Sequence, residues 1–213
     1  MIISHKYKFI FIHINKCGGT SITKALIPYL GKKDLILGCL PKYEKLSEEY
    51  LKKYQIYKHS TASEIRNFIE EDIWNKYFKF TFTRNPWSKI LSTYFWFHKY
   101  KNWGKGGKAD KIRRLPDFSS YAKSKYLDEK SCSLFIFDDQ GSNLMNFIGK
   151  QENLDRDFAY VCGKLGLPLI TLNKENNTQH SGYHKYYDEE AKMMVANKYA
   201  DDIKNFNYEF SEL

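Results

Sequence analysis

The stretch FIFIHINKCGGTS, residues 9–21, decides the fold of this chain. Residues 9–14 form an almost continuous apolar run, as expected for a strand that is buried on both faces of a parallel sheet. Gly18 and Gly19 follow, and a glycine lets backbone N–H groups approach a ligand closely because it has no Cβ atom. Apolar residues then recur at helical spacing from residue 22 to residue 29. The stretch therefore predicts a strand, a tight turn and a helix.

The turn in this stretch has the composition of an anion-binding site. A helix that begins after a glycine turn presents N–H groups and the positive end of its dipole to an anion. Lys16 adds a full positive charge, and Thr20 and Ser21 add hydroxyl groups. In the nucleotide-triphosphate loop, G-x-x-x-x-G-K-[ST], the Lys follows the glycines, whereas here it precedes them. We therefore expect a phosphate or a sulfate on a different kind of loop.

A second strand–turn–helix unit covers residues 77–97, YFKFTFTRNPWSKILSTYFWF. Apolar and polar residues alternate from 77 to 83, which predicts a strand. An Asn-Pro pair then supplies a favourable N-cap and first helical residue. Arg84 closes the strand, and Ser92 lies about two turns into the helix. A guanidinium group offers forked donors to a phosphate, and a serine hydroxyl adds one more, so this unit predicts a second phosphate site.

Together the two motifs resemble those of sulfotransferases that use 3'-phosphoadenosine-5'-phosphosulfate (PAPS). Lys-x-Gly-Gly-Thr-Ser after a strand resembles their 5'-phosphosulfate loop, and Arg-Asn-Pro-x-x-Lys-x-x-Ser-x-Tyr resembles their 3'-phosphate motif. The pattern is most similar to the carbohydrate branch that includes heparan sulfate 2-O-sulfotransferase and bacterial enzymes, whose loop reads IHxPKxGGTS. Asn15 replaces the Pro of that loop, and Cys17 replaces the Thr that is common at the variable position after the Lys. Neither change removes a charged contact. The resemblance implies an α/β, P-loop-like three-layer α/β/α fold with a central, mainly parallel sheet.

The resemblance also implies roles for single residues. The cofactor-binding set would be Lys16, Cys17, Gly18, Gly19, Thr20, Ser21, Arg84, Ser92 and Lys185. Lys16 would also be catalytic, because it would neutralise charge that grows on the bridging oxygen. His59, 25 residues before Arg84, stands where the family has its catalytic base, with Glu64 as the less favoured substitute. His13 is expected to be a structural residue of the strand.

Two further segments are candidates for closing over the cofactor. Residues 173–187 are polar, and in the family a loop before the last helix contacts the cofactor. Besides Lys185, the candidates there are His180, Ser181, Tyr183 and His184. Residues 98–117 are basic and contain three glycines, so they are either a solvated loop or a mobile lid, in which Trp103 could stack on a sugar or on adenine.

The composition of the chain restricts the number of domains, the kinds of partner and the compartment that are expected. The chain has 213 residues, 42% of them hydrophobic, which favours a single domain over residues 1–213. Its net charge of +9 favours acidic partners, although scattered lysines also serve as a solvated surface. The four cysteines form no C-x-x-C pair, and no signal peptide or long apolar span is recognisable. We expect a reduced, cytoplasmic protein without a metal, a membrane anchor or a nucleic-acid partner.

The remaining elements follow from local patterns. We expect short strands at 35–40 and 145–148, a strand or buried turn at 131–137, and helices near 46–54, 62–73, 118–130, 154–165 and 189–206. Thr61 and Glu64 have the spacing of a capping box, and Asp188 is expected to cap the last helix.

The predicted function is sulfuryl transfer from PAPS to a hydroxyl group, with a carbohydrate as the favoured acceptor and no required metal. Two alternatives stay open. One is a P-loop nucleotide-dependent kinase or phosphotransferase, which would need ATP and Mg²⁺. The other is a non-catalytic protein that binds anionic glycans or RNA, which the positive charge allows.

Overall fold

The computed structural model describes residues 1–101, 104–173 and 182–211. Contacts within the chain divide it into two compact units. Unit 1 comprises Met1–Thr83 and Cys132–Glu175, and unit 2 comprises Arg84–Ser131 and Asn176–Leu213. Each unit therefore combines two segments that are far apart in the sequence.

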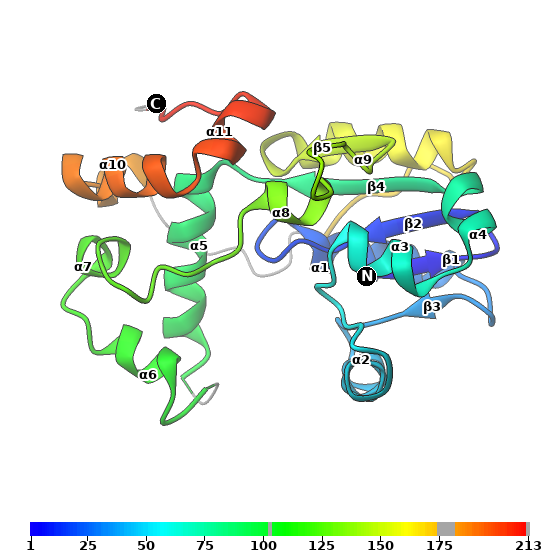
Figure 1. The fold of residues 1–213 in the computed structure, drawn as a ribbon, viewed down its shortest axis with the longest axis horizontal. Coiled ribbons are helices and arrows are strands. Elements are labelled where there is room, and N and C mark those ends of the chain that lie inside the picture. Colours follow the sequence, from blue (N-terminus) through cyan, green and yellow to red (C-terminus); the bar gives the residue numbers. More distant parts are fainter. Residues whose placement is uncertain (102–103, 174–181, 212–213) are drawn as a thin grey trace. The chain divides into compact units, whose positions relative to one another are not determined.

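Unit 1 contains a five-stranded sheet in the order β3-β1-β2-β4-β5 (Figure 1). The strands are β1 (Ile2–Ser4), β2 (Phe9–Ile12), β3 (Leu35–Ile36), β4 (Phe78–Thr83) and β5 (Phe147–Lys150). The central strands β2, β4 and β5 are parallel, with Phe11 beside Phe80 and Phe80 beside Phe147. β1 is antiparallel to both of its neighbours. A mixed α/β unit with a parallel centre is thus confirmed.

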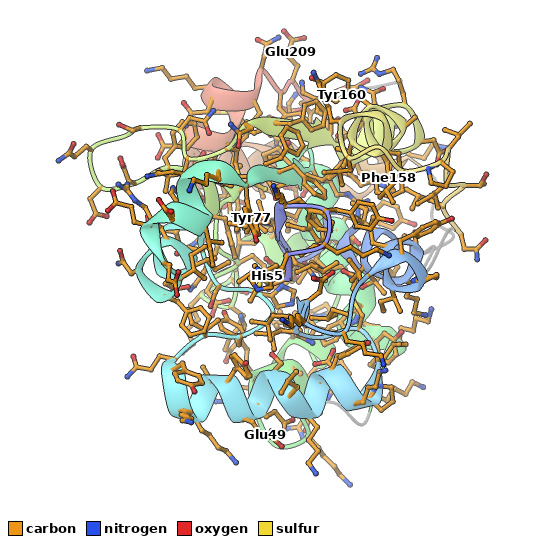
Figure 2. All side chains as sticks on the ribbon, turned by 90° about the vertical axis from the view of Figure 1, so that its right-hand side faces the viewer. His5, Glu49, Tyr77, Phe158, Tyr160 and Glu209 are labelled. Atoms are coloured by element: carbon orange, nitrogen blue, oxygen red, sulfur yellow. The ribbon has the colours of Figure 1, made fainter. Side chains whose placement is uncertain are left out.

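Helices lie on both faces of this sheet. The helices of unit 1 are α1 (Gly19–Leu26), α2 (Pro41–Tyr54), α3 (Ala62–Phe68), α4 (Glu71–Lys76), α8 (Cys132–Ile136) and α9 (Leu154–Lys164), with one-turn 3-10 helices at Ile27–Tyr29 and Gln151–Asn153. Figures 1 and 2 show α1 and α9 on one face of the strands and α3 and α4 on the other. The anion loop lies between β2 and α1, so the sheet determines where it stands.

Aromatic side chains hold the strands of unit 1 together. The rings of Phe11 and Phe80 stack with centroids 5.0 Å apart, and both side chains are buried. β4 is also buried on its polar side, where the Thr81 hydroxyl donates to the Ile12 carbonyl at 2.7 Å. The alternation in β4 therefore marks a strand correctly, although both of its faces are covered. At the edge of the unit His5 contacts Tyr77, with 2.8 Å between Nδ1 and the phenolic oxygen (Figure 2).

Unit 2 is built around the long helix α5 (Pro86–Lys99) (Figure 1). The other helices are α6 (Lys108–Arg113), α7 (Phe118–Ala122), α10 (Glu189–Lys198) and α11 (Ala200–Phe206), with a 3-10 helix at Tyr183–Tyr186. Trp87, Ile90 and Leu91 of α5 share one core with Ala191 and Val195 of α10. The Trp87 indole also donates to the Lys192 carbonyl at 3.0 Å, which fixes the contact of α10 with α5.

Helix caps predicted from the sequence are confirmed. Asn85 accepts hydrogen bonds from the backbone N–H groups of Trp87 and Ser88. Thr61 and Glu64 form a complete capping box at the start of α3. Asp188 accepts from the backbone N–H of Ala191 in α10. Caps are readable because donor and acceptor lie within three residues of each other.

Six elements differ from the sequence predictions. The helix expected at 118–130 ends at Ala122, where the Lys123 N–H caps it on the carbonyls of Ser119 and Tyr121. β1 was not expected, and α8 stands where a strand or turn was predicted. The helix expected over 62–73 is interrupted where Ile69 is extended, and the acidic residues Glu71 and Asp72 favour a new helix start there. The last helix is interrupted at Tyr199, whose hydroxyl donates to the Glu129 carbonyl at 2.9 Å. α6 occupies part of 98–117, so the expectation of an irregular loop is wrong for Lys108–Arg113.

Three predicted positions lie outside the described residues, namely Trp103, His180 and Ser181. Within the described part of the chain, no helix is both long and apolar enough to cross a membrane.

Candidate functional site

The loop between β2 and α1 has the geometry of an anion cradle. Gly18 is the N-cap of α1 and takes the left-handed conformation, with φ 80° and ψ 1°. Lys16 is also left-handed, with φ 63°, which is uncommon for a residue with a Cβ atom. The Gly18 carbonyl accepts from the Ile22 N–H at 3.3 Å, so α1 begins at once after the turn. The first N–H groups of a helix have no partner within that helix, so they are available to an anion.

The loop side chains differ in direction. Lys16 and Thr20 are half-buried, whereas Cys17 is 1% exposed and Ser21 7% exposed. The Cys17 thiol lies 3.4 Å from the Asn15 carbonyl and 3.8 Å from the thiol of Cys132 in α8. Cys17 therefore points into unit 1, and its backbone is the part that could contact an anion. The sequence held no signal for the Cys17–Cys132 contact, because the two residues are 115 positions apart.

Gly19 has a packing requirement that the sequence did not reveal. A Cβ atom on Gly19 would lie 2.1 Å from Cδ2 and 2.4 Å from Nε2 of His13. His13 itself is 5% exposed, and its ring stacks on Phe11 with centroids 5.8 Å apart. The His13 ring thus takes the space in which a side chain at position 19 would stand.

We expect Gly19→Ala to lower the melting temperature by several degrees, because overpacking a filled site costs about 1–3 kcal/mol. The measurement is thermal unfolding of the purified variant. Gly163→Ala in α9 is the matched control, since a Cβ atom there would meet nothing within 4 Å. Equal melting temperatures for the two variants would contradict the contact between His13 and Gly19.

His59 is anchored to the same strand end. Its Nδ1 atom lies 2.8 Å from the carbonyl oxygen of His13, and the two rings meet edge to face with centroids 4.8 Å apart. A carbonyl oxygen only accepts, so Nδ1 of His59 carries the proton and Nε2 holds the lone pair. The bond therefore fixes His59 in the tautomer that a general base with an accepting Nε2 requires.

Both histidines of this pair are neutral at pH 7. Burial lowers the pKa of His59 to about 4, and the nearby Lys58 ammonium adds to the effect. Burial also holds the pKa of His13 well below its ordinary value. Lys58 forms an ion pair with Glu44 at 2.8 Å. The Glu64 carboxylate accepts from the Thr61 N–H at 2.7 Å, so it is already used in the cap of α3.

The lowered pKa of His59 predicts a pH-dependent stability. In the unfolded chain His59 takes up a proton near pH 6.5, whereas in the folded chain it does so only near pH 4. The unfolded state therefore binds more protons between these values, and stability falls as the pH drops from about 6.5 to 4. The free energy of unfolding, measured with urea at several pH values in this range, should depend less steeply on pH in His59→Asn than in the parent protein. An unchanged dependence on pH would mean that the pKa of His59 is not lowered in the fold.

The second predicted motif lies in unit 2. Arg84 is half-buried, and its Nε donates to the Ser88 hydroxyl at 3.0 Å. Ser92 lies one turn further along α5 on the same face and is 5% exposed. Ser88 was missed in the sequence, although its spacing of four residues from Arg84 and from Ser92 was a usable signal. The Lys of this motif, Lys89, is fully buried and donates to the Lys130 carbonyl, so it has a structural contact in unit 2.

Lys185 lies exposed on the 3-10 helix Tyr183–Tyr186 of unit 2. The Tyr183 hydroxyl accepts from the Ser211 N–H at 2.7 Å, and Nδ1 of His184 is buried with no hydrogen-bond partner among the described residues. In the described ranges, no group of three or more His, Cys, Asp or Glu residues is placed to hold a metal ion. Within unit 1, therefore, the structure brings together the anion loop, His13 and His59. Within unit 2 it places Arg84, just before α5, in contact with Ser88, and Ser92 lies one turn further along α5.

Comparison with known proteins identifies the class. The sequence model described as "Sulfotransferase family" matches residues 1–209, so the chain belongs to the sulfotransferase family. The chain is also similar to an uncharacterized protein of Archaeoglobus fulgidus, with 30% identity over 124 residues. That alignment covers 57% of this chain and 94% of the archaeal protein. No solved structure matches this chain. Family membership supports sulfuryl transfer in general, from a sulfonate donor to a hydroxyl-bearing acceptor.

Proposed function

We propose that this protein transfers the sulfuryl group of PAPS to a hydroxyl group, with a carbohydrate as the favoured acceptor, on a P-loop-like α/β/α fold. The observation that carries the proposal is a neutral, backbone-anchored His59 in the same unit as a Lys-bearing anion loop. A sulfuryl transferase needs these two parts, since it must stabilise an anionic leaving group and accept a proton from a hydroxyl.

The anion loop supports the first requirement. The donor, when bound, supplies an electrophilic sulfur and a phosphate leaving group. Lys16 neutralises the charge that grows on the bridging oxygen as the sulfur–oxygen bond breaks. The backbone N–H groups at Gly18, Gly19 and Thr20 bind the phosphate oxygens. Such prearranged donors often make the largest single contribution to catalysis.

His59 meets the second requirement. A sugar hydroxyl is a poor nucleophile at neutral pH, so a base that accepts its proton during the attack raises the rate. Nε2 of His59 carries the lone pair, because Nδ1 donates to the His13 carbonyl. The base is in its active form at pH 7, since the pKa of His59 is about 4.

The 3'-phosphate is assigned to the second motif. Arg84 supplies a fork of donors, and Ser92 supplies a hydroxyl. Ser88 joins them as a positioning residue, because its hydroxyl accepts from Nε of Arg84 and so restricts the guanidinium. Lys185 is the candidate for a further contact with the phosphate or with adenine.

The decisive experiment compares ligands by their effect on unfolding. Adenosine 3',5'-bisphosphate should raise the melting temperature more than ATP with Mg²⁺ at equal concentration, because a ligand that binds only the folded state stabilises it. Transfer of labelled sulfate from PAPS to a panel of sugars should follow. Stronger stabilisation by ATP with Mg²⁺ would instead favour a nucleotide-dependent phosphotransferase. Salt-sensitive binding of polyanions without bisphosphate binding would favour a non-catalytic binding protein.

A further inference from the structure

The imidazole ring of His13 is buried beside the anion loop. His13 follows β2, is 5% exposed, and lies against Gly19 at the first position of α1. The main-chain carbonyl of His13 accepts a hydrogen bond from His59, but the His13 ring takes no part in that bond. A polar ring this deeply buried requires a partner or a ligand.

The two ring nitrogens of His13 have different surroundings. Nδ1 is buried and has no hydrogen-bond partner among the described residues. Nε2 lies on the Gly19 side of the ring, 2.4 Å from the point where a Cβ atom of residue 19 would stand. A neutral imidazole has one donor and one acceptor nitrogen. Orphaned buried donors are rarer than under-satisfied acceptors in folded proteins, so Nδ1 is the better site for the lone pair. Nε2 then carries the proton.

We propose that the Nε2–H group of His13 is a further donor to the tetrahedral oxyanion held by the loop at residues 16–21. Glycine at position 19 is what allows this, because any side chain there would displace the ring. The identity of the anion, the phosphosulfate end of PAPS, rests on the proposed function. The donor geometry itself applies equally to a free sulfate or phosphate.

The proposed contact gives His13 two roles at one strand end. Its side chain binds the anion, and its carbonyl fixes the tautomer of His59. A shift of the strand end would therefore move the anion and the base together. Because His13 is neutral, it adds a hydrogen bond without adding a second charge beside Lys16.

Two variants distinguish the effect of the N–H donor of His13 from the effect of the space that its ring fills. His13→Gln keeps an N–H group at a comparable distance from the backbone, whereas His13→Met is apolar and adaptable. Titration calorimetry with adenosine 3',5'-bisphosphate, and separately with inorganic sulfate, should show weaker binding to His13→Met. A lost hydrogen bond to a charged group predicts a loss of roughly 10- to 100-fold. His13→Gln should bind within about threefold of the parent protein, given the same kind of donor.

Nitrogen-15 NMR of the parent protein tests the inference without any substitution. A protonated Nε2 whose signal moves on addition of sulfate or bisphosphate supports it, even if His13→Met fails to fold. A proton on Nδ1, or an Nε2 signal unmoved by an anion that calorimetry shows to bind, would overturn it. Sulfate binding that moves Nε2 while the bisphosphate does not bind would retain the anion contact and reject PAPS as the donor. Equal affinities of His13→Gln and His13→Met would also overturn it.

Discussion

Lys16→Ala is expected to lower kcat for sulfuryl transfer by roughly 10²- to 10³-fold, as the loss of one prearranged donor to a developing oxyanion does elsewhere. Lys16 has a left-handed backbone conformation two residues before the N-cap of α1, and its ammonium group is the charge that the loop adds to the backbone donors. Alanine keeps the same backbone requirement at φ 63°, so the change removes the charge without relaxing the turn. The measurement is transfer of labelled sulfate from PAPS under saturating acceptor.

A matched control lies on α1, the helix that follows the loop. Lys24→Ala removes an equal charge from the last turn of α1, and its rate should stay close to that of the parent protein. Lys16→Arg should recover part of the rate, because it restores the charge with a different donor geometry. Similar rates for Lys16→Ala and Lys24→Ala would show that the loop lysine is not the group that neutralises the leaving phosphate.

His59→Asn is expected to lower kcat by about 10²- to 10⁴-fold, the range that a positioned base supplies. The asparagine amide can still donate to the His13 carbonyl as Nδ1 of His59 does, but it offers no basic nitrogen. Affinity for adenosine 3',5'-bisphosphate should therefore be kept. For the parent protein, kcat should be level between pH 6 and 8 and fall as the pH approaches about 4, where His59 becomes protonated.

His98→Asn is the matched control for this substitution. Nδ1 of His98 lies 2.9 Å from the Tyr94 carbonyl, which is the same kind of contact on α5 of unit 2. Its kcat should remain near the parent value. The assignment of His59 as the base fails if His59→Asn keeps full transfer activity while its bisphosphate affinity is unchanged.

Local patterns in the sequence were sufficient to predict the main helices and strands. The anion loop, the Asn85 cap and the capping box of Thr61 and Glu64 all depend on residues within a few positions of each other. The family was also predictable, since the loop and the Arg84 motif carry it in their order along the chain. The roles given to Lys16 and His59 remain predictions that the experiments above test.

Contacts between distant residues could not be predicted. β1 is only three residues long and becomes a strand because both β2 and β3 pair with it. Cys17 meets Cys132 across 115 positions. The contact of the His13 ring with Gly19 depends on how sharply the chain turns, which single-sequence patterns do not encode. Tertiary packing decides each of these, and it left no periodic trace in the sequence.

The packing of α5 against α10 has a consequence for synthesis of the chain on the ribosome. α5 is complete at Lys99, but α10 is complete only at Lys198. At about 5–20 residues per second, translation needs roughly 5–20 s for that interval. During this time Ile90 and Leu91 lack their α10 neighbours Ala191 and Val195, whereas strands β1 to β4 are already made when α5 is complete and β5 is complete at Lys150. The apolar side of α5 is therefore a surface of the nascent chain that needs protection from aggregation.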